Sequence, residues 1–222
     1  MDKVALVELV KSGELIAGLD LTGVDLSGAD LSGGIFEKVK FAGANLTGGS
    51  LEESIFSGCD FSGFIAPDAR IRHATFQGCV GRSADFSRCN AHLTRFLGSN
   101  FAASKFDEGD LLGCAFARSE LQMASFARAN LDRTQFVETP VDGAVFTGAN
   151  MKQTVLLGCD MRGANIRDTK LDTVVLVKGN LAGMDLSGMD LELCQFMDAD
   201  MAGALLAGAN LTQCNFKGTN LK

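Results

Sequence analysis

The sequence places a large apolar residue at every fifth position, without a slip in register, from Ile16 to Leu221. These central positions hold Leu, Phe, Ile, Val or Met almost throughout, and only Ala66, Gly81 and Ala91 depart from the rule. All but one of the 16 phenylalanines lie in this register. An amphipathic helix repeats every 3.6 residues and a half-buried strand every two, so neither produces this pattern. It predicts a chain that turns a corner every five residues.

Small residues and glycines keep the same period. The position two before each centre is usually Ala, Gly, Ser, Thr or Cys, and all seven cysteines lie there. Twenty of the 26 glycines lie two positions after a centre. Glycine suits the third position of a type II turn, where the backbone needs a positive φ. We therefore expect the centre and the small residue before it to point inward at every corner.

The repeated segments "ADLSG", "ANLTG", "CDFSG", "GANLT" and "MDLSG" resemble the pentapeptide-repeat family, whose consensus is A(D/N)LXX. The resemblance covers about residues 16–221. It implies an all-β fold: a right-handed quadrilateral parallel β-helix, or pentapeptide-repeat solenoid, with four pentapeptides in each of about ten coils. Coils of this kind stack at the ~4.8 Å spacing of paired backbones.

The two ends of such a solenoid need separate treatment, because repeats are stabilised only by their neighbours. Residues 1–15 are predicted to form an N-terminal capping helix, and residues 16–222 the β-helix. The helix carries apolar residues that would cover the first coil, namely Val4, Leu6, Val7, Leu9 and Val10. The repeat is still in register at residue 221, which predicts an open edge that makes an end-to-end contact or continues into further chain.

With four pentapeptides per coil, residues 20 apart stack on one face of the rod. One face, called the Phe face below, has centres at every twentieth position from Ile16 to Phe216. Most of these centres are phenylalanines, so a continuous aromatic stack is expected beneath this face. The predicted core stack comprises Phe36, Phe56, Phe76, Phe96, Phe116, Phe136, Phe196 and Phe216.

Outward positions on the Phe face are unusually apolar, whereas the equivalent positions elsewhere are mostly polar or charged. One reading is that β-branched residues favour extended backbone even when exposed. The reading we favour is a partner interface, because a strip of this length exceeds the exposed apolar area that monomers tolerate. This apolar strip consists of Leu97, Ala117, Val137, Val155, Leu157, Val175, Val177 and Met197.

The sequence thus predicts a non-catalytic scaffold that binds a protein partner, or a second copy as a homodimer, through the Phe face. The family resemblance offers two alternatives. Some relatives bind DNA gyrase as mimics of DNA, but the mixed surface charge and the absence of a C-terminal helical segment argue against this here. The opening "AGLDLTGVDLSGADLSGG" also resembles modules that accompany bacterial type VI secretion systems and help to handle effectors.

Other classes of function find little support. The net charge of −7 disfavours direct nucleic-acid binding, and no apolar run is long enough to span a membrane. No secretory signal is recognised, so we expect a cytoplasmic protein or one exported without a signal peptide. We expect no catalytic residues, no cofactor and no metal. A filled rod offers no concavity for a substrate.

Three groups of residues could suggest a site but have simpler readings. The pairs Cys59/Cys79 and Cys194/Cys214 stack on adjacent coils but are poorly aimed for disulfides, so buried thiols are expected. His73 and His92 share a face and are read as surface residues. Residues 64–93 lose the repeat signature without losing the register, and a local bulge with compensating packing is the simpler expectation than a loop.

Overall fold

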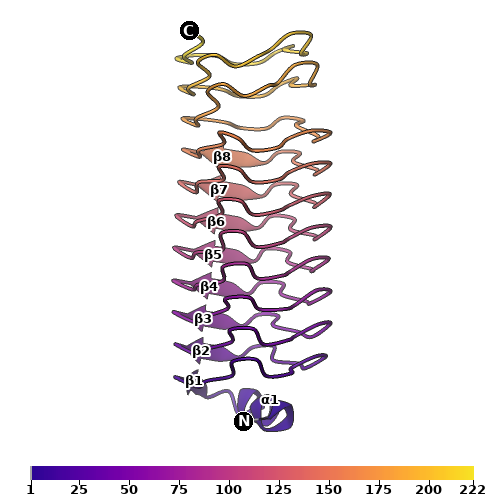
Figure 1. Cartoon of the computed structure of the whole chain (residues 1–222), viewed down its shortest axis with the longest axis vertical. Coiled ribbons are helices and arrows are strands. Elements are labelled where there is room, and N and C mark those ends of the chain that lie inside the picture. Colours follow the sequence, from indigo (N-terminus) through magenta and orange to yellow (C-terminus); the bar gives the residue numbers. More distant parts are fainter. Residues whose placement is uncertain (1) are drawn as a thin grey trace.

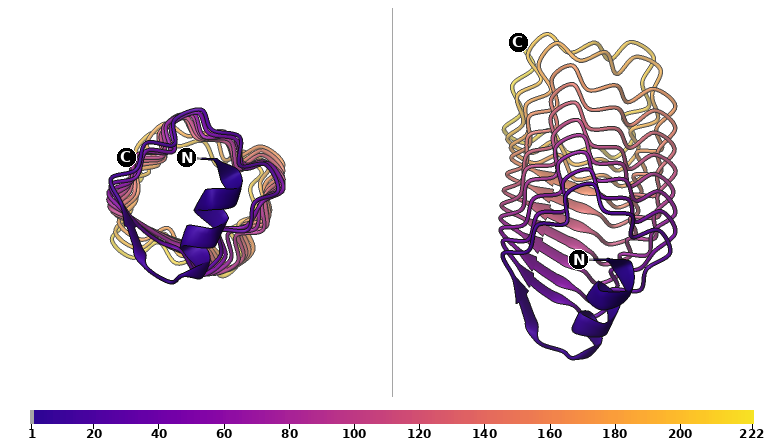
Figure 2. Two further views of the ribbon diagram at one scale, coloured as in Figure 1. Left: turned by 90° about the horizontal axis from the view of Figure 1, so that it is seen from below. Right: turned by 60° about the horizontal axis from the view of Figure 1, so that its bottom comes forward.

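The computed structural model describes residues 2–222, which wind into a parallel β-solenoid with one short N-terminal helix (Figure 1). Viewed along the axis, the coils superpose as four-sided rings (Figure 2). The strands in chain order are β1 (Leu15–Ala17), β2 (Ile35–Glu37), β3 (Ile55–Ser57), β4 (Thr75–Gln77), β5 (Arg95–Leu97), β6 (Ala115–Ala117), β7 (Gln135–Val137) and β8 (Val155–Leu157). They form one sheet in that order, which confirms the predicted fold class.

The spacing of 20 residues per coil holds along the whole ladder. Each of the seven strand pairs is parallel and in register, as in Ile16 opposite Phe36 and Phe136 opposite Leu156. The strands proper therefore account for seven turns, slightly fewer than the ten predicted. Single bridges continue the same spacing for three more turns on this face, ending with Gln195 opposite Asn215.

Corners on the other three faces are tight turns. The carbonyl of Phe41 accepts from the N–H of Ala44 at 2.9 Å, and Gly43 between them has φ +63°. This is the type II geometry predicted from the glycine spacing. It makes the central residue and the small residue that follows the turn both point into the rod, and Phe41 and Ala44 are accordingly buried.

The Phe face between β1 and β8 is built differently, as an extended strand without that turn hydrogen bond. After β4, β5 and β6 the inward residue donates its N–H to a hydroxyl of the next coil, as in Cys79 to the Oγ of Ser99 at 3.0 Å and Ser99 to the Oγ of Ser119 at 3.2 Å. From residue 174 onward the face changes to the tight turn, as shown by the bond from the Ala199 N–H to the Phe196 carbonyl.

Helix α1 (Lys3–Lys11) lies across the first coil, as the end-on view in Figure 2 shows. Asp2 caps its N-terminus by accepting from the Ala5 N–H at 2.9 Å, and Gly13 beyond its C-terminus has φ +74°. Leu6 and Val10 are buried against the coil. The helix thus covers the apolar residues that would otherwise be exposed at this end.

The irregular stretch 64–93 follows the same path as its neighbours, and no loop protrudes from it in the described chain. Phe64 points inward and packs edge-on against Phe61 at 5.1 Å, next to the small centre Ala66. At Gly81 an added Cβ would lie only 2.1 Å from the ring of Phe101. Large rings at neighbouring positions therefore occupy the space that the small centres leave free.

Candidate functional site

The apolar strip lies on one face of the solenoid, in two columns set by the strand register. Leu97 pairs with Ala117, and Val137 pairs with Leu157. The bond from Gly158 N–H to the Val177 carbonyl and the bond from Lys178 N–H to the Met197 carbonyl extend this column by two coils. Val155 opposite Val175 forms the second, shorter column. All eight residues are thus brought together on successive coils.

The side chains of the strip are half-buried because neighbours one coil apart shield each other. Leu157 is the most open, with 36% of its surface exposed. The backbone beneath is a parallel ladder as far as β8 and is joined by single bridges beyond it, so the strip forms a continuous surface and not a set of isolated side chains. Contiguous apolar surface of this kind is typical of protein-interaction sites.

Charged residues border the strip on one side. The positions that follow the long column hold Arg118, Glu138, Lys178 and Asp198, which alternate in sign along the rod, with glycine after Leu97 and Leu157. Arg95 and Gln135 lie on the other side of the column and are exposed. An apolar centre with a polar rim is the usual anatomy of a protein–protein interface.

A second apolar patch occupies the N-terminal end of the same face. Leu15, Ile35 and Ile55 stack in β1, β2 and β3, with exposed fractions of 56%, 41% and 48%. Thr75 and Arg95 continue that column and make it polar before the strip begins. Ile35 and Ile55 stand out in the sequence as outward apolar residues of this face, but their separation from the strip follows only from the register.

The Phe face is backed by stacked aromatic rings. Phe36 and Phe56 stack with ring centroids 4.9 Å apart, and Phe96 and Phe116 with centroids 4.7 Å apart. The stack continues to Phe136, is interrupted by Leu156 and Leu176, and resumes in the pair formed by Phe196 and Phe216. A second set of rings, including Phe126 and Phe146, meets the first edge-on. Beneath Leu97, Ala117 and Val137 this packing makes the face a rigid support for a docking surface.

The cysteines have the character of small core residues. All seven are free thiols, and all except Cys214 are buried. Burial raises the pKa of Cys89 and of Cys194 to about 12, and that of Cys159 to about 11. These three thiols therefore stay protonated near neutral pH, whereas nucleophilic and metal-binding cysteines act as thiolates.

The two histidines do not form a common site. The Nε2 atom of His92 lies 2.5 Å from the carboxylate of Asp110, which also accepts from the Asn130 side chain. His73 is joined to His92 through the backbone, since its N–H donates to the His92 carbonyl at 3.0 Å, and it occupies a turn position with φ +57°. Within residues 2–222 no group of three or more potential ligands could hold a metal ion.

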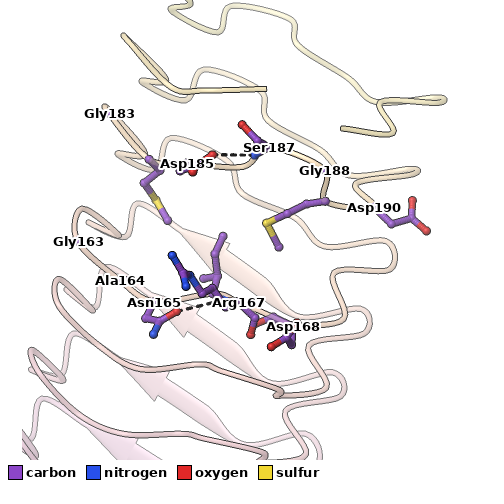
Figure 3. A pocket seen from close by; sticks show the side chains of 14 residues that line it. Gly163, Ala164, Asn165, Arg167, Asp168, Gly183, Asp185, Ser187, Gly188 and Asp190 are labelled. Atoms are coloured by element: carbon purple, nitrogen blue, oxygen red, sulfur yellow. Dashed lines mark hydrogen bonds between the residues drawn. The ribbon is translucent and has the colours of Figure 1, made fainter. Parts of the chain in front are cut away.

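One feature was missed by the sequence reasoning, which expected a rod without a concavity: a slot between two coils near the C-terminal end. No backbone hydrogen bond joins residues 163–173 to residues 183–193 in the described chain, although pairing is regular on either side. The slot has a volume of about 960 Å³, and Figure 3 shows Asn165 on one wall with Asp185 and Ser187 on the other. It spans two adjacent corners of the rod.

Two methionines account for the slot. Met184 and Met189 occupy inward positions that two coils earlier hold Ala144 and Ala149. Phe64 stands in the same column as Met184, but the small centre Ala66 gives its ring room, whereas the centres after the two methionines are leucines. A methionine side chain needs more room than the coil spacing of ~4.8 Å leaves for alanine. The signal was present in the segment "MDLSGMDL", as two large residues at positions where the repeat has small ones.

No helix of the described residues is both long and apolar enough to cross a bilayer. Comparison with known proteins gives a consistent result for the family and the fold. A model of a pentapeptide repeat region matches residues 49–126, and a model of pentapeptide repeats in eight copies matches residues 25–63, 142–176, 180–213 and 194–222. No curated protein sequence matches the chain significantly.

Among solved structures, the chain is similar to a trypsin-treated variant of QnrB1, a plasmid-mediated fluoroquinolone resistance protein. The identity is 18%, the TM-score is 0.58, and the match covers 94% of this chain and 92% of the other. HetL, a pentapeptide repeat protein involved in heterocyst differentiation regulation from the cyanobacterium Nostoc sp. strain PCC 7120, is 21% identical. That match covers 99% and 96% of the two chains with a TM-score of 0.44.

Proposed function

The chain belongs to the pentapeptide-repeat family, and from that premise we propose that it is a non-catalytic protein-binding scaffold. The apolar strip would be the docking surface, for another protein or for a second copy of this chain. The observation that carries the proposal is the register of the strip, which aligns six residues from Leu97 to Met197 in one column. Five coil spacings make this column about 24 Å long.

The chemistry of the strip favours a partner with a flat apolar surface. Its residues are aliphatic or methionine, and the charges that border it alternate in sign. A twofold arrangement of two copies would place each strip against the other, since a surface that pairs with itself must be self-complementary. A mixed-sign rim permits this, because each positive residue can face a negative residue of the second copy.

The test is a pair of charge substitutions within the strip. Val155→Asp with Val177→Asp should leave the circular dichroism spectrum unchanged, because both side chains lie outside the core. If the wild-type protein sediments as a dimer, the double variant should sediment as a monomer. If the wild type is monomeric, it should capture from native lysate a protein that the variant does not retain.

The matched control is Val80→Asp with Val145→Asp, which makes the same chemical change at outward positions on other faces. The control should associate like the wild type. Equal association by the strip variant and the wild type would contradict the proposal. Unfolding of the strip variant, but not of the control, would show that these side chains act in folding.

A second candidate function comes from the likeness to QnrB1: a DNA mimic that protects DNA gyrase from quinolones. Its support is the match over nearly the full length of both chains, together with the net charge of −7. The assay is gyrase supercoiling in the presence of a quinolone. Restoration of supercoiling at submicromolar protein would favour this function over the scaffold that docks through its apolar strip.

A further inference from the structure

We propose that the slot between residues 163–173 and 183–193 is a binding site for a basic peptide in extended conformation. The slot lies on different faces from the apolar strip, so the proposal is independent of the scaffold function. It rests on the backbone groups that the two coils leave unpaired, on the charges of the walls and on the two methionines that hold the coils apart.

The unpaired backbone groups are defined by the coils on either side. One coil earlier, the Phe146 N–H donates to the Asn165 carbonyl at 2.7 Å and the Asn165 N–H donates to Ala144 at 2.8 Å. In the same register, the N–H of Ile166 would meet the carbonyl of Asp185. These two groups have no hydrogen-bond partner within the described protein.

The same holds on the next face for the Leu171 N–H and the Asp190 carbonyl. The N–H groups of Asp185 and Asp190 and the carbonyls of Ala164 and Thr169, which the same register would join, also have no backbone partner within residues 2–222. Each wall of the slot therefore presents both donors and acceptors. An extended peptide backbone carries the same alternation and can hydrogen-bond along a strand edge, as in β-strand addition. A simple anion or cation would satisfy only one of the two kinds of group.

The charge of the walls selects the side chains of the peptide. Asp168, Asp185 and Asp190 line the slot, against the single cation Arg167. Hydrogen bonds from Ser187 hold the pKa of Asp185 below its ordinary value, and the Arg167 guanidinium lowers it further. The walls are thus predominantly anionic near neutral pH, which favours lysine or arginine in the bound segment.

The methionines make the site specific to this place in the rod. Their side chains give the slot an apolar interior next to the core residues Ile166 and Leu186, so that alternate side chains of a bound strand would meet an apolar and a charged environment. Methionine surfaces adapt to varied peptide side chains. Met184 and Met189 therefore both hold the two coils apart and line the site.

The first measurement is amide hydrogen exchange of the full chain. We expect the amides of Ile166 and Leu171 to exchange much faster than those of Phe146 and Met151, which are paired in the same positions one coil earlier. Equal protection of the two sets would show that the coils are closed in solution and would overturn the proposal.

The second measurement is titration with a blocked heptapeptide of alternating lysine and threonine, followed by backbone amide NMR shifts. Saturable shifts confined to residues 163–173 and 183–193 are expected. The matched peptide with glutamate in place of lysine should not bind. Absence of shifts at millimolar lysine peptide, or equal binding of the glutamate peptide, would overturn the assignment.

Two variants separate the site from a general effect of charge. Met184→Ala with Met189→Ala should let the coils pair, protect the Ile166 amide and abolish binding. Asp185→Asn with Asp190→Asn keeps the side-chain oxygens that accept from the backbone, and should weaken binding about fivefold. Unchanged peptide affinity in both double variants would show that the peptide binds elsewhere.

Discussion

The coils up to β8 and the coils after residue 163 obey one repeat and yet pack differently. The first region is filled by phenylalanine rings stacked from coil to coil, and its backbone ladder on the Phe face is unbroken. The second has a core of leucine, isoleucine and methionine around Ile166, Leu176 and Leu186, and two of its faces lose their pairing. A register in sequence therefore sets the path of the chain, while the size of the inward residues decides whether the coils close.

The largest expected effect comes from removing a ring in the first region. Phe116 is fully buried and stacks on Phe96 and Phe136, so Phe116→Ala should lower the free energy of unfolding by about 3–5 kcal/mol. Leu176→Ala removes the equivalent centre in the second region, where a small void already exists, and should cost about 2–3 kcal/mol. Urea denaturation followed by circular dichroism measures both.

The order of these two losses is what the comparison depends on. Leu176 has less tightly packed surroundings, so its neighbours can relax into the space that alanine leaves. If Leu176→Ala lowered the free energy of unfolding as much as Phe116→Ala, the two cores would be equally well packed. The slot would then be confined to the surface, without a looser core beneath it.

Placing two methionines at the equivalent inward positions of the first region should give it a slot like that of the second region. Ala144 and Ala149 are fully buried and occupy, two coils earlier, the positions of Met184 and Met189. Ala144→Met with Ala149→Met should open a slot in the first region and destabilise the protein by about 2–4 kcal/mol, since overpacking costs about 1–3 kcal/mol per site. Hydrogen exchange of residues 123–133, the facing coil, should become fast.

The control for this double substitution places methionine at outward positions, where the side chain meets no packed core. Ala17→Met with Ala207→Met adds two methionines at exposed outward positions and should change neither stability nor exchange. If the Ala144→Met, Ala149→Met variant is as stable as the wild type and the amides of residues 123–133 stay protected, methionine size is not the cause of the slot. Another feature of residues 163–193 must then hold the coils apart.

Much of the fold follows from the sequence because the physics of this solenoid is local and repeated. Each corner needs a large inward residue, a small one and a turn, so one register of five residues fixes which residues point inward. The coil of four repeats, and with it the spacing of 20, the faces and the handedness, is implied by the family resemblance. Together they predict the position of Val137 beside Leu157.

The remaining features depend on fit between coils, which a periodic pattern does not contain. The slot depends on whether two methionines can be accommodated beneath a particular coil. The compensation of Gly81 by Phe101 is of the same kind, because it involves residues 20 apart whose volumes must match. Sequence reasoning that scores each position against a consensus registers such residues as exceptions, without showing which exceptions compensate each other.

The smallest expected effect concerns a property that should not differ between the regions. Asp30, in a paired coil, accepts from the Ser32 hydroxyl and N–H, and these bonds lower its pKa. Asp185, at the slot, has its pKa lowered in the same way by Ser187. A depressed folded-state pKa gives stability that is present above the unfolded value, ~3.9, and is lost as the pH falls through the folded value.

Asp30→Asn and Asp185→Asn each retain the accepting side-chain oxygen but cannot titrate. Relative to the wild type, each variant should therefore lose less of its stability between about pH 5 and pH 2, and by a similar small amount. Urea midpoints across that pH range measure the difference. The hydrogen bonds to each carboxylate lie within one turn, so the two effects should be similar. At Asp30 the Ser32 hydroxyl is also hydrogen-bonded to the Ser50 hydroxyl of the next coil at 2.7 Å. A clearly larger effect at Asp30 would mean that this contact between coils also stabilises the carboxylate, and the two regions would then differ even in their turns.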